Sequence, residues 1–513
     1  MNRYLVCIII MLCWAPGYGQ DIPLHDFWNR EIEKIKLTRA TPYATSYKPL
    51  LQSETDFNQF PSQIKDSAKY YWNINRILFR DHWIEYKKED VSINVDPWID
   101  ASYFQDRSNP DFNNQYGRQY NNSRGARIQG KIGSTFSFHT GFLENQSYFP
   151  YYMTLICDSL SVVPGMGRFK AFKGNGYDYA ISSSALNIEP NSHFHLTLQY
   201  GRQMIGNGYR SLLLSDAAMN YPFVSSRISF NKWTYVSSAG LMQEQQRIPL
   251  GATAESLFKR KINTWNYIIF HPFPAIELGI MESVSYSIWN EQGRKSPQYS
   301  IYIPLLGARS ALSSDTTSTT LYGLNLKWNV AKKFTIYGQY ASMRNQAKSK
   351  GVQAGVLYSN FLIKNLDVRL EYNTTDPYLY ATKNDLLSYS QQSQSLGHPA
   401  GGDLKEWLIR MDYRYKRFLL HGDINQITQN IGGGADIYVQ DFHSIPFGVR
   451  SLIQWQGQFG ILVNPKSNLC LWMGYTHRHD VRSNQSQNWS QKVDASLITI
   501  SLSSTFHSRY FDF

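Results

Sequence analysis

Short segments in which apolar and polar residues alternate recur along most of this chain. Strict alternation places every second side chain on the same face of a β-strand. In Ile409–Tyr415 one face is apolar and aromatic, while the other carries Arg410, Asp412 and Arg414. The same pattern appears in Phe136–Phe138, Phe194–Tyr200, Tyr322–Val330, Phe334–Ile336 and Val368–Tyr372. The alternation predicts β-structure from about residue 91 to the end of the sequence.

The length of this region indicates one large architecture. At roughly 20–25 residues for a strand and its connection, about 420 residues give about 16–18 strands. The sequence holds no Pro/Gly/Ser-rich linker after residue 91 and no apolar run there near the roughly 20 residues of a membrane helix. A soluble sandwich would show the same alternation, but the number of strands favours an all-β fold, an antiparallel transmembrane β-barrel of the outer membrane.

Residues 20–90 follow a different period. Trp28, Ile32 and Ile35 lie at helical spacing within residues 25–37, and residues 62–79 repeat this pattern. We predict a short helical segment over residues 20–90, either on the periplasmic side of the barrel or inside its lumen. The barrel is predicted over residues 91–513.

The first 19 residues predict export. Arg3 precedes an apolar run, and Gly17 and Gly19 supply the small residues before a cleavage site, as in a secretory signal peptide. A lipoprotein anchor at Cys13 is the less favoured alternative, because Leu12 is bulky for a lipobox. Since Arg3 is the only charged residue among the first 19, cleavage lowers the formal net charge of +12 by one.

Charge and cysteine content bear on partners and cofactors. The basic residues are scattered, which together with export argues against nucleic acid and favours acidic surface polymers or lipid headgroups as partners. Cys157 and Cys470 remain after cleavage, and the sequence leaves open one disulfide or two thiols. No zinc or iron–sulfur spacing occurs, so no metal or other cofactor is expected.

The end of the sequence resembles an assembly signal. Ile498, Ile500 and Leu502 alternate with polar residues, and the last residue is Phe513. We predict that the last strand ends in this aromatic residue, as outer-membrane barrels do when they are recognised for insertion.

Residues 201–224 interrupt the alternation with a polar loop. Its glycines allow positive φ or close backbone approach, and its side chains supply a phenol, a guanidinium, hydroxyls and a carboxylate. These residues are Gly206, Gly208, Tyr209, Arg210, Ser211, Ser215 and Asp216. We predict that Arg210 and Asp216 pair and leave Tyr209 and Ser211 free for a ligand. The alternative is a structural turn whose charges pair with each other or with the barrel wall.

Two further stretches carry side chains that recognise sugar hydroxyls. They contain Arg124 with Glu144, Asn145 and Gln146, and the loop from His398 to Glu406. No nucleophile elbow, zinc-protease motif or phosphate-binding loop is present. Ser215 and Asp216 with His398 could form a hydrolytic set of the outer-membrane phospholipase kind, and a pore for small solutes is a third possibility.

Several short motifs, in this order, carry a family resemblance. They are Ser123-Arg124-Gly125, Glu144-Asn145-Gln146 with Pro150, Pro164-Gly165, Gly206–Asp216 with Tyr221-Pro222, and His398-Pro399 with Gly401 and Glu406. They resemble the RemB-type gliding-motility proteins of Bacteroidetes, a group similar to the Wzi-type capsule-assembly outer-membrane proteins. The likeness runs from about residue 75 to about residue 415. The chain departs from the pattern at Gly402-Asp403.

The resemblance implies a non-enzymatic outer-membrane barrel with a helical N-terminal part. Such a protein would hold or organise capsular or other surface polysaccharide, or act in surface adhesion and gliding with proteins of a gliding or secretion machine. It would bind the polymer through many weak contacts on an extracellular face, which add through multivalency.

Overall fold

The computed structural model describes most of the chain after residue 72 and a few earlier residues. The described residues are 22, 24–25, 44–51, 72–247, 258–290, 293–294, 298–313, 317–344, 348–437, 447–484, 488–504, 506 and 508–513. The predicted signal peptide, nearly all of the predicted helix over residues 25–37, and residues 62–71 of the second predicted helix lie outside them.

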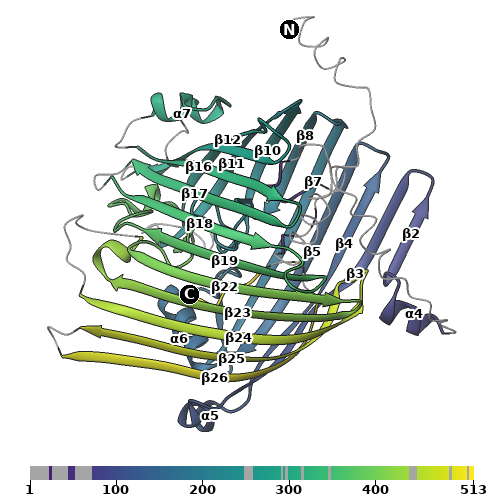
Figure 1. Cartoon of the computed structure of the whole chain (residues 1–513), viewed down its shortest axis with the longest axis vertical. Coiled ribbons are helices and arrows are strands. Elements are labelled where there is room, and N and C mark those ends of the chain that lie inside the picture. Colours follow the sequence, from purple (N-terminus) through teal and green to yellow (C-terminus); the bar gives the residue numbers. More distant parts are fainter. Residues whose placement is uncertain are drawn as a thin grey trace, which may run out of the picture.

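Eighteen antiparallel strands form a closed barrel, which confirms the predicted fold class and strand number. Each strand pairs with its neighbour along the chain, and β26 closes the ring against β3, with Ser503 opposite Asp100 and Leu497 opposite Asp106. Figure 1 shows this ring. The strands are β3 (Val91–Asp106), β4 (Gln119–Ile132), β5 (Phe136–Tyr148), β7 (Gly176–Asn191), β8 (Phe194–Gly201), β10 (Tyr221–Phe230), β11 (Trp233–Arg247), β12 (Phe258–Phe270), β13 (Ile276–Ser287), β16 (Ser318–Ala331), β17 (Phe334–Arg344), β18 (Lys350–Tyr358), β19 (Leu366–Thr375), β22 (Leu404–Tyr415), β23 (Phe418–Ile431), β24 (Gly448–Asn464), β25 (Leu469–Asn484) and β26 (Trp489–Ser504).

Short strands and helices complete the described fold. Two short strands extend the barrel edge, where β2 pairs with β3 and β6 pairs with β7. Three further two-stranded sheets are formed by β1 with β9, β14 with β15 and β20 with β21. Their bounds are β1 (Tyr47–Lys48), β2 (Ile84–Lys88), β6 (Lys170–Phe172), β9 (Met204–Ile205), β14 (Trp289–Asn290), β15 (Gly293–Arg294), β20 (Ser390–Gln391) and β21 (Gln394–Ser395). The helices are α4 (Asn73–Phe79), α5 (Pro110–Tyr116), α6 (Tyr151–Leu160), α7 (Ala308–Ala311), η1 (Tyr299–Tyr302), η2 (Asp385–Leu387) and η3 (Gly433–Ala435).

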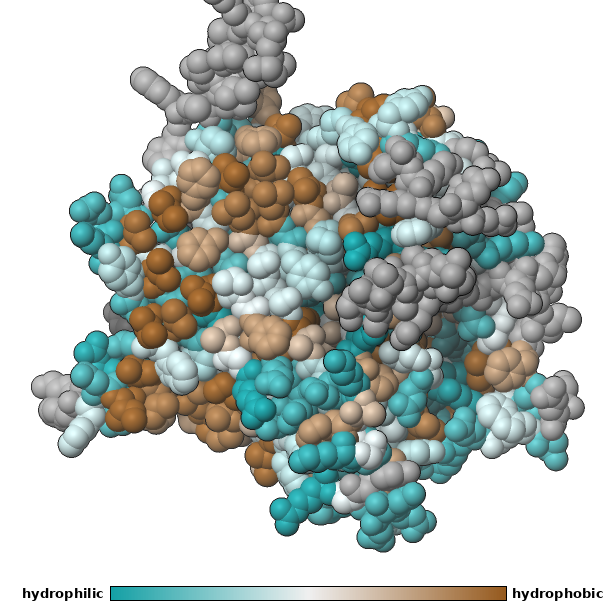
Figure 2. Space-filling model, turned by 180° about the vertical axis from the view of Figure 1, so that it is seen from behind, coloured by the Kyte–Doolittle hydropathy of each residue, from teal (hydrophilic) through white to brown (hydrophobic). Residues whose placement is uncertain are grey.

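Side chains sort to the two faces of the barrel as the alternation predicts. On β22 the outward Ile409 and Met411 are exposed, and the inward Glu406 and Arg410 are buried. Figure 2 shows apolar side chains gathered in a band over the outer wall, with hydrophilic residues beyond it. Exposed apolar residues of β5, β7, β8 and β10 form part of this band: Phe136, Phe142, Leu186, Leu198, Val224 and Ile228.

The two ends of the barrel differ in their connections. At one end, called here the short-turn end, two residues join β7 to β8, β10 to β11, β16 to β17 and β22 to β23. At the other, the long-loop end, residues 149–175, 202–220, 288–317 and 376–403 form long connections. Helix α4 lies at the short-turn end, where Arg417 donates to the carbonyl oxygen of Phe79 and Asn464 to that of Ile77. No helix among the described residues has the length and apolarity needed to cross a membrane.

Several segments fold inward and fill much of the lumen. Residues 202–220 and 376–403 pack together there, and Leu212, Leu213 and Leu214 are fully buried within that core. Residues 44–51 join them from the N-terminal part, since β1 pairs with β9. A cavity of about 340 Å³ remains in the lumen beside Tyr209.

The C-terminal residues correct one prediction. The last strand ends at Ser504, and residues 508–513 turn back into the lumen, where Tyr510 and Asp512 are buried. Phe513 packs against the buried inner-wall residues Leu404 and Leu452 instead of ending a strand. The prediction of a terminal aromatic on the last strand is therefore wrong, because the tail finds polar and apolar partners inside the barrel.

The two cysteines that follow the predicted signal peptide are separate thiols. Cys157 lies on α6 and Cys470 on β25, and both are buried and free. The possibility of one disulfide, left open by the sequence, is therefore excluded.

Candidate functional site

The loop Gly206–Asp216 is fixed inside the barrel by wall carboxylates. Glu371 on β19 accepts the backbone N–H groups of Tyr209 at 2.8 Å and Arg210 at 3.0 Å, and the hydroxyl of Tyr337 at 2.8 Å. Gly208 permits this approach, because a Cβ there would lie 2.7 Å from a Glu371 carboxylate oxygen. The glycines of this loop therefore have a packing role.

Arg210 forms the centre of a buried charge network. Its guanidinium makes ion pairs with Glu406 at 3.0 Å and with Asp512 at 3.1 Å. Burial alone would lower the pKa of Arg210, but the carboxylates of Asp512 and Glu406 outweigh it and raise the pKa well above its usual value. His398 donates its Nε2–H to the second carboxylate oxygen of Glu406 at 2.8 Å, since its Nδ1 accepts the N–H of Ala400. The network joins two lumen loops, the wall and the tail.

The predicted pair of Arg210 with Asp216 is wrong. Asp216 accepts a hydrogen bond from the hydroxyl of Tyr510 at 2.7 Å, and the partners of Arg210 are the wall residue Glu406 and the tail residue Asp512. The alternative, in which loop charges pair with the barrel wall, is confirmed for Arg210. No pattern in the sequence indicated the tail residue as a partner, because 302 positions separate it from Arg210.

Tyr209 and Ser211 are not free for a ligand. The Tyr209 hydroxyl donates to Asp512 at 3.0 Å, and its ring lies 3.7 Å from the guanidinium of Arg410. The Ser211 hydroxyl donates to the carbonyl oxygen of Ile205 and accepts from the N–H of Leu214. Both residues act in folding the loop.

The hydrolytic set is not assembled. Both ring nitrogens of His398 are occupied, Nε2 by Glu406 and Nδ1 by the N–H of Ala400. Ser215 is buried, and its Oγ accepts from the N–H of Ala217. His398 therefore has no ring nitrogen directed at Ser215. Among the residues that the structure describes, no group of three His, Cys, Asp or Glu residues could hold a metal ion.

The remaining predicted residues lie on the wall, away from the lumen loop. Arg124 and Glu144 pair across β4 and β5 at 3.5 Å, with side chains 61% and 46% exposed. Gln146 lies on the same outward face, whereas Asn145 points inward and donates to the carbonyl oxygens of Leu143 and Tyr179. The structure thus separates these four residues from the Gly206–Asp216 loop.

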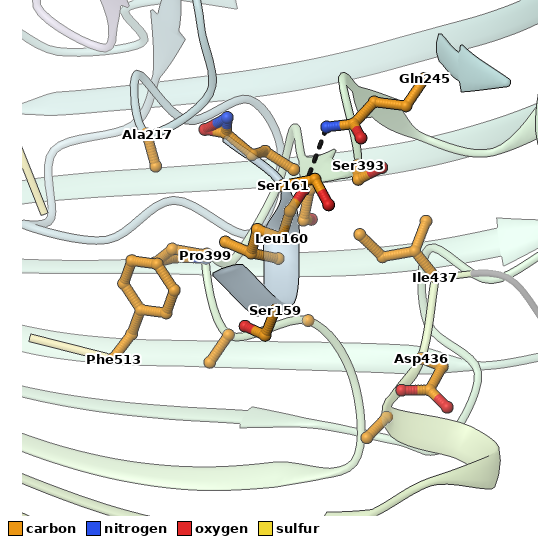
Figure 3. Close-up of a pocket in the computed structure, with 15 residues that line it drawn as sticks. Ser159, Leu160, Ser161, Ala217, Gln245, Ser393, Pro399, Asp436, Ile437 and Phe513 are labelled. Carbon is orange, nitrogen blue, oxygen red and sulfur yellow. Dashed lines mark hydrogen bonds between the residues drawn. The ribbon is translucent and has the colours of Figure 1, made fainter. Parts of the chain in front are cut away.

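A cavity at the long-loop end was not foreseen from the sequence. It has a volume of about 450 Å³ and is bounded by α6, by β11, by the loops around residues 393–401 and 435–437, and by the tail. Figure 3 shows the Phe513 ring on one side, and Ile437 and Asp436 on the other. Hydroxyl and amide side chains dominate its polar lining: Ser159, Ser161, Gln245, Ser393, Gln394 and Ser395.

Two polar groups of this cavity are relevant to binding. Gln394 is buried, and its Oε1 accepts the N–H of Gly165 at 2.9 Å. Its Nε2 has no hydrogen-bond partner among the described residues, which leaves a buried donor for a molecule in the cavity. Partial burial raises the pKa of Asp436. Two sequence signals pointed to this cavity: the polar run of residues 388–395, and the predicted stretch from His398 to Glu406, whose Pro399, Ala400 and Gly401 line it. Its other walls come from distant connections.

Comparisons with known proteins agree with the fold. No protein-family model matches the chain, and no curated protein matches it by sequence. Among solved structures, the chain is similar to Wzi of Escherichia coli, an outer-membrane protein involved in group 1 capsule assembly and a carbohydrate-binding β-barrel. The TM-score is 0.57 at 13% identity, over 95% of this chain and 100% of Wzi. The outer-membrane protein OpdK of Pseudomonas aeruginosa matches 80% of this chain, with 98% of its own length, at a TM-score of 0.43 and 10% identity. At 13% identity the likeness to Wzi shows the fold alone.

Proposed function

We propose that this protein is an exported outer-membrane barrel that binds a surface polysaccharide at its long-loop end. In outer-membrane barrels the turns are short on the periplasmic side and the connections are long on the outside. The cavity beside Gln394 would then face the outside. Its hydroxyls, amides and the Phe513 ring are the groups that contact sugar hydroxyls and sugar rings.

One observation carries the proposal: the unpartnered Nε2 of Gln394 in a cavity whose polar lining consists mostly of hydroxyl and amide groups. A buried amide without a partner costs about 1–3 kcal/mol, and a ligand oxygen would recover it. The fold shared with a carbohydrate-binding barrel supports the same ligand class. The protein acts without catalysis in this proposal, as an attachment or organising site for capsular or exported polysaccharide.

The filled lumen favours binding over solute transport. Arg210, Glu406 and Asp512 tie two lumen loops and the tail to the wall, and breaking such a buried pair is costly. A small-solute channel remains the competing function, and conductance in planar bilayers separates the two. We expect purified protein to conduct poorly and to bind polysaccharide.

A binding measurement tests the cavity directly. Polysaccharide extracted from the surface of the source organism would be titrated against purified protein and against Gln394→Glu. This variant keeps an acceptor for the Gly165 N–H but removes the amide donor, so binding should weaken several-fold. Arg124→Ala, on the outer wall, is the control and should bind normally. Equal binding by the Gln394→Glu protein contradicts the proposed site.

Deletion of the gene tests the role in the cell. Polymer shed into the medium, with less on the surface, is expected for an attachment protein. Unchanged surface polysaccharide with altered spreading on agar would instead assign the protein to adhesion or gliding, the second role that the RemB-type motifs imply.

A further inference from the structure

Part of the connection from β13 to β16 folds over the outer wall of the barrel instead of over its mouth. We call residues 298–313 the wall flap. Its Gly307 and Ser310 N–H groups donate to the carboxylate of Glu282 at 2.9 and 3.0 Å. Glu282 lies on the outward face of β13, in line with the exposed Ile280, yet it is only 2% exposed. The flap therefore covers an outward-facing acid.

Further contacts hold the flap against two more strands, β11 and β12. The Tyr235 hydroxyl on β11 donates to the carbonyl oxygen of Pro304 at 2.7 Å, and Asn266 on β12 donates to that of Leu305 at 3.1 Å. Arg309 of α7 donates back to Ser237 on β11 at 3.2 Å. The position of the flap is thus fixed by the wall. Figure 1 shows α7 outside the ring of strands.

An apolar contact supports the same position. Ile301 of η1 packs with the outward-facing Val284 and Tyr286 of β13 and with Ile262 of β12. The polar and apolar groups of the flap that face the barrel are therefore paired with the wall.

The opposite side of the flap is apolar and exposed. Tyr299 and Tyr302 are each 72% exposed, Leu305 is 61% exposed and Leu312 is 50% exposed. A short, well-anchored segment that exposes four large apolar side chains would be costly in water.

The flap is continuous with the apolar band of the barrel. Tyr235, which holds the flap, lies opposite Ile268 in the β-ladder, Ile268 lies opposite Ile280, and Ile280 lies opposite Leu324. Ile280 and Leu324 are about half exposed on the outer wall. The flap thus reaches the row of side chains that faces the surroundings of the barrel.

We propose that the wall flap lies in the outer leaflet of the membrane, with Tyr299, Tyr302, Leu305 and Leu312 in contact with lipid. This inference rests on the proposed outer-membrane location. Lipid is the partner that covers the exposed side of the flap, because this side extends the apolar band that faces lipid in the proposed location. Two tyrosines beside leucines also match the aromatic girdles at membrane interfaces.

A lipid-quenching experiment tests the flap. Leu305→Cys would be labelled with bimane and reconstituted into dioleoylphosphatidylcholine vesicles, with and without brominated acyl chains. Removal of the predicted signal peptide takes away Cys7 and Cys13. Cys157 and Cys470 are buried, so the folded protein is labelled at the new position. Leu324→Cys on the apolar band is the lipid-facing control, and Asn114→Cys, exposed on α5 at the same end, is the aqueous control. Leu312→Cys gives a second flap position should the first variant fail to fold.

We expect the flap labels to be quenched by brominated lipid nearly as strongly as the Leu324 label, and the Asn114 label to be unaffected. Quenching at Leu324 but not at Leu305 or Leu312 would overturn the flap proposal alone. Cross-linking of two flap cysteines in place of quenching would assign the flap to a second copy and also overturn it. Absence of quenching at Leu324 would overturn both the flap proposal and the membrane location.

Discussion

Arg210 and Asp512 form a buried ion pair of 3.1 Å although 302 positions separate them in the sequence. The first belongs to the loop between β8 and β10, and the second to the tail after β26. Tyr209 donates its hydroxyl to the same carboxylate. The pair therefore locks the last residues of the chain into the lumen and makes the loop and the tail one structural unit.

Loss of Arg210 should destabilise the barrel. Arg210→Ala leaves the buried carboxylates of Glu406 and Asp512 without their cation, which costs about 3–5 kcal/mol. The Arg210→Ala/Asp512→Ala double variant should cost much less than the sum of the single changes, because the residues share one network. Urea unfolding measures these differences. Arg124→Ala is the matched control, since its exposed pair with Glu144 is worth about 0–1 kcal/mol. If the losses of stability in Arg210→Ala and Asp512→Ala add up in the double variant, the coupling is refuted.

Gly206→Ala should disturb the lumen loop. Gly206 has a φ of +144°, and a Cβ there would collide with the amide nitrogen of Gln339. Strain of this kind costs about 1–3 kcal/mol before the clash is added. Gly457→Ala on β24 is the control, because a Cβ there meets no atom within 4 Å. The temperature at which half of each variant shifts to the unfolded position on a gel compares the two proteins. Equal temperatures would show that the loop tolerates a side chain at Gly206.

Removal of residues 508–513 should leave the barrel assembled but open its lumen. All eighteen strands end before this tail, whereas Asp512 and Tyr510 bind Arg210 and Asp216 inside the barrel. We expect near-normal amounts in the outer membrane and a raised conductance in planar bilayers. A strong loss from the membrane with little change in conductance would restore the tail as an assembly signal.

Binding of an anionic polymer should weaken as pH rises. Partial burial raises the pKa of Asp436, so this carboxyl stays neutral to a higher pH than a free aspartate and then adds a negative charge to the cavity. Because the folded-state pKa is the higher one, ionisation also removes a small part of the stability as pH rises through it. Asp436→Asn should flatten the pH profile of binding, measured on an acidic polysaccharide. A pH profile identical to that of the natural protein would exclude Asp436 as the cause of the pH dependence.

The barrel could be predicted from the sequence, because the evidence for it is local. Alternation with a period of two appears within each strand, and on β22 it already separated Ile409 and Met411 outside from Arg410 inside. It also marked Gly206–Asp216 and His398–Glu406 as unusual; the first segment and the part of the second before β22 fold into the lumen, and Glu406 lies on the wall.

Which residues of the loops, wall and tail contact one another depends on the three-dimensional fold. Glu406 lies 196 positions from Arg210, and closure of the ring places the tail beside both. The cavity around Gln394 is bounded by five separate parts of the chain and by Phe513. The wall flap depends on Glu282 facing outward beneath it. Such contacts depend on the register of many paired strands and on which loops turn inward. The local alternation of apolar and polar residues predicts neither property.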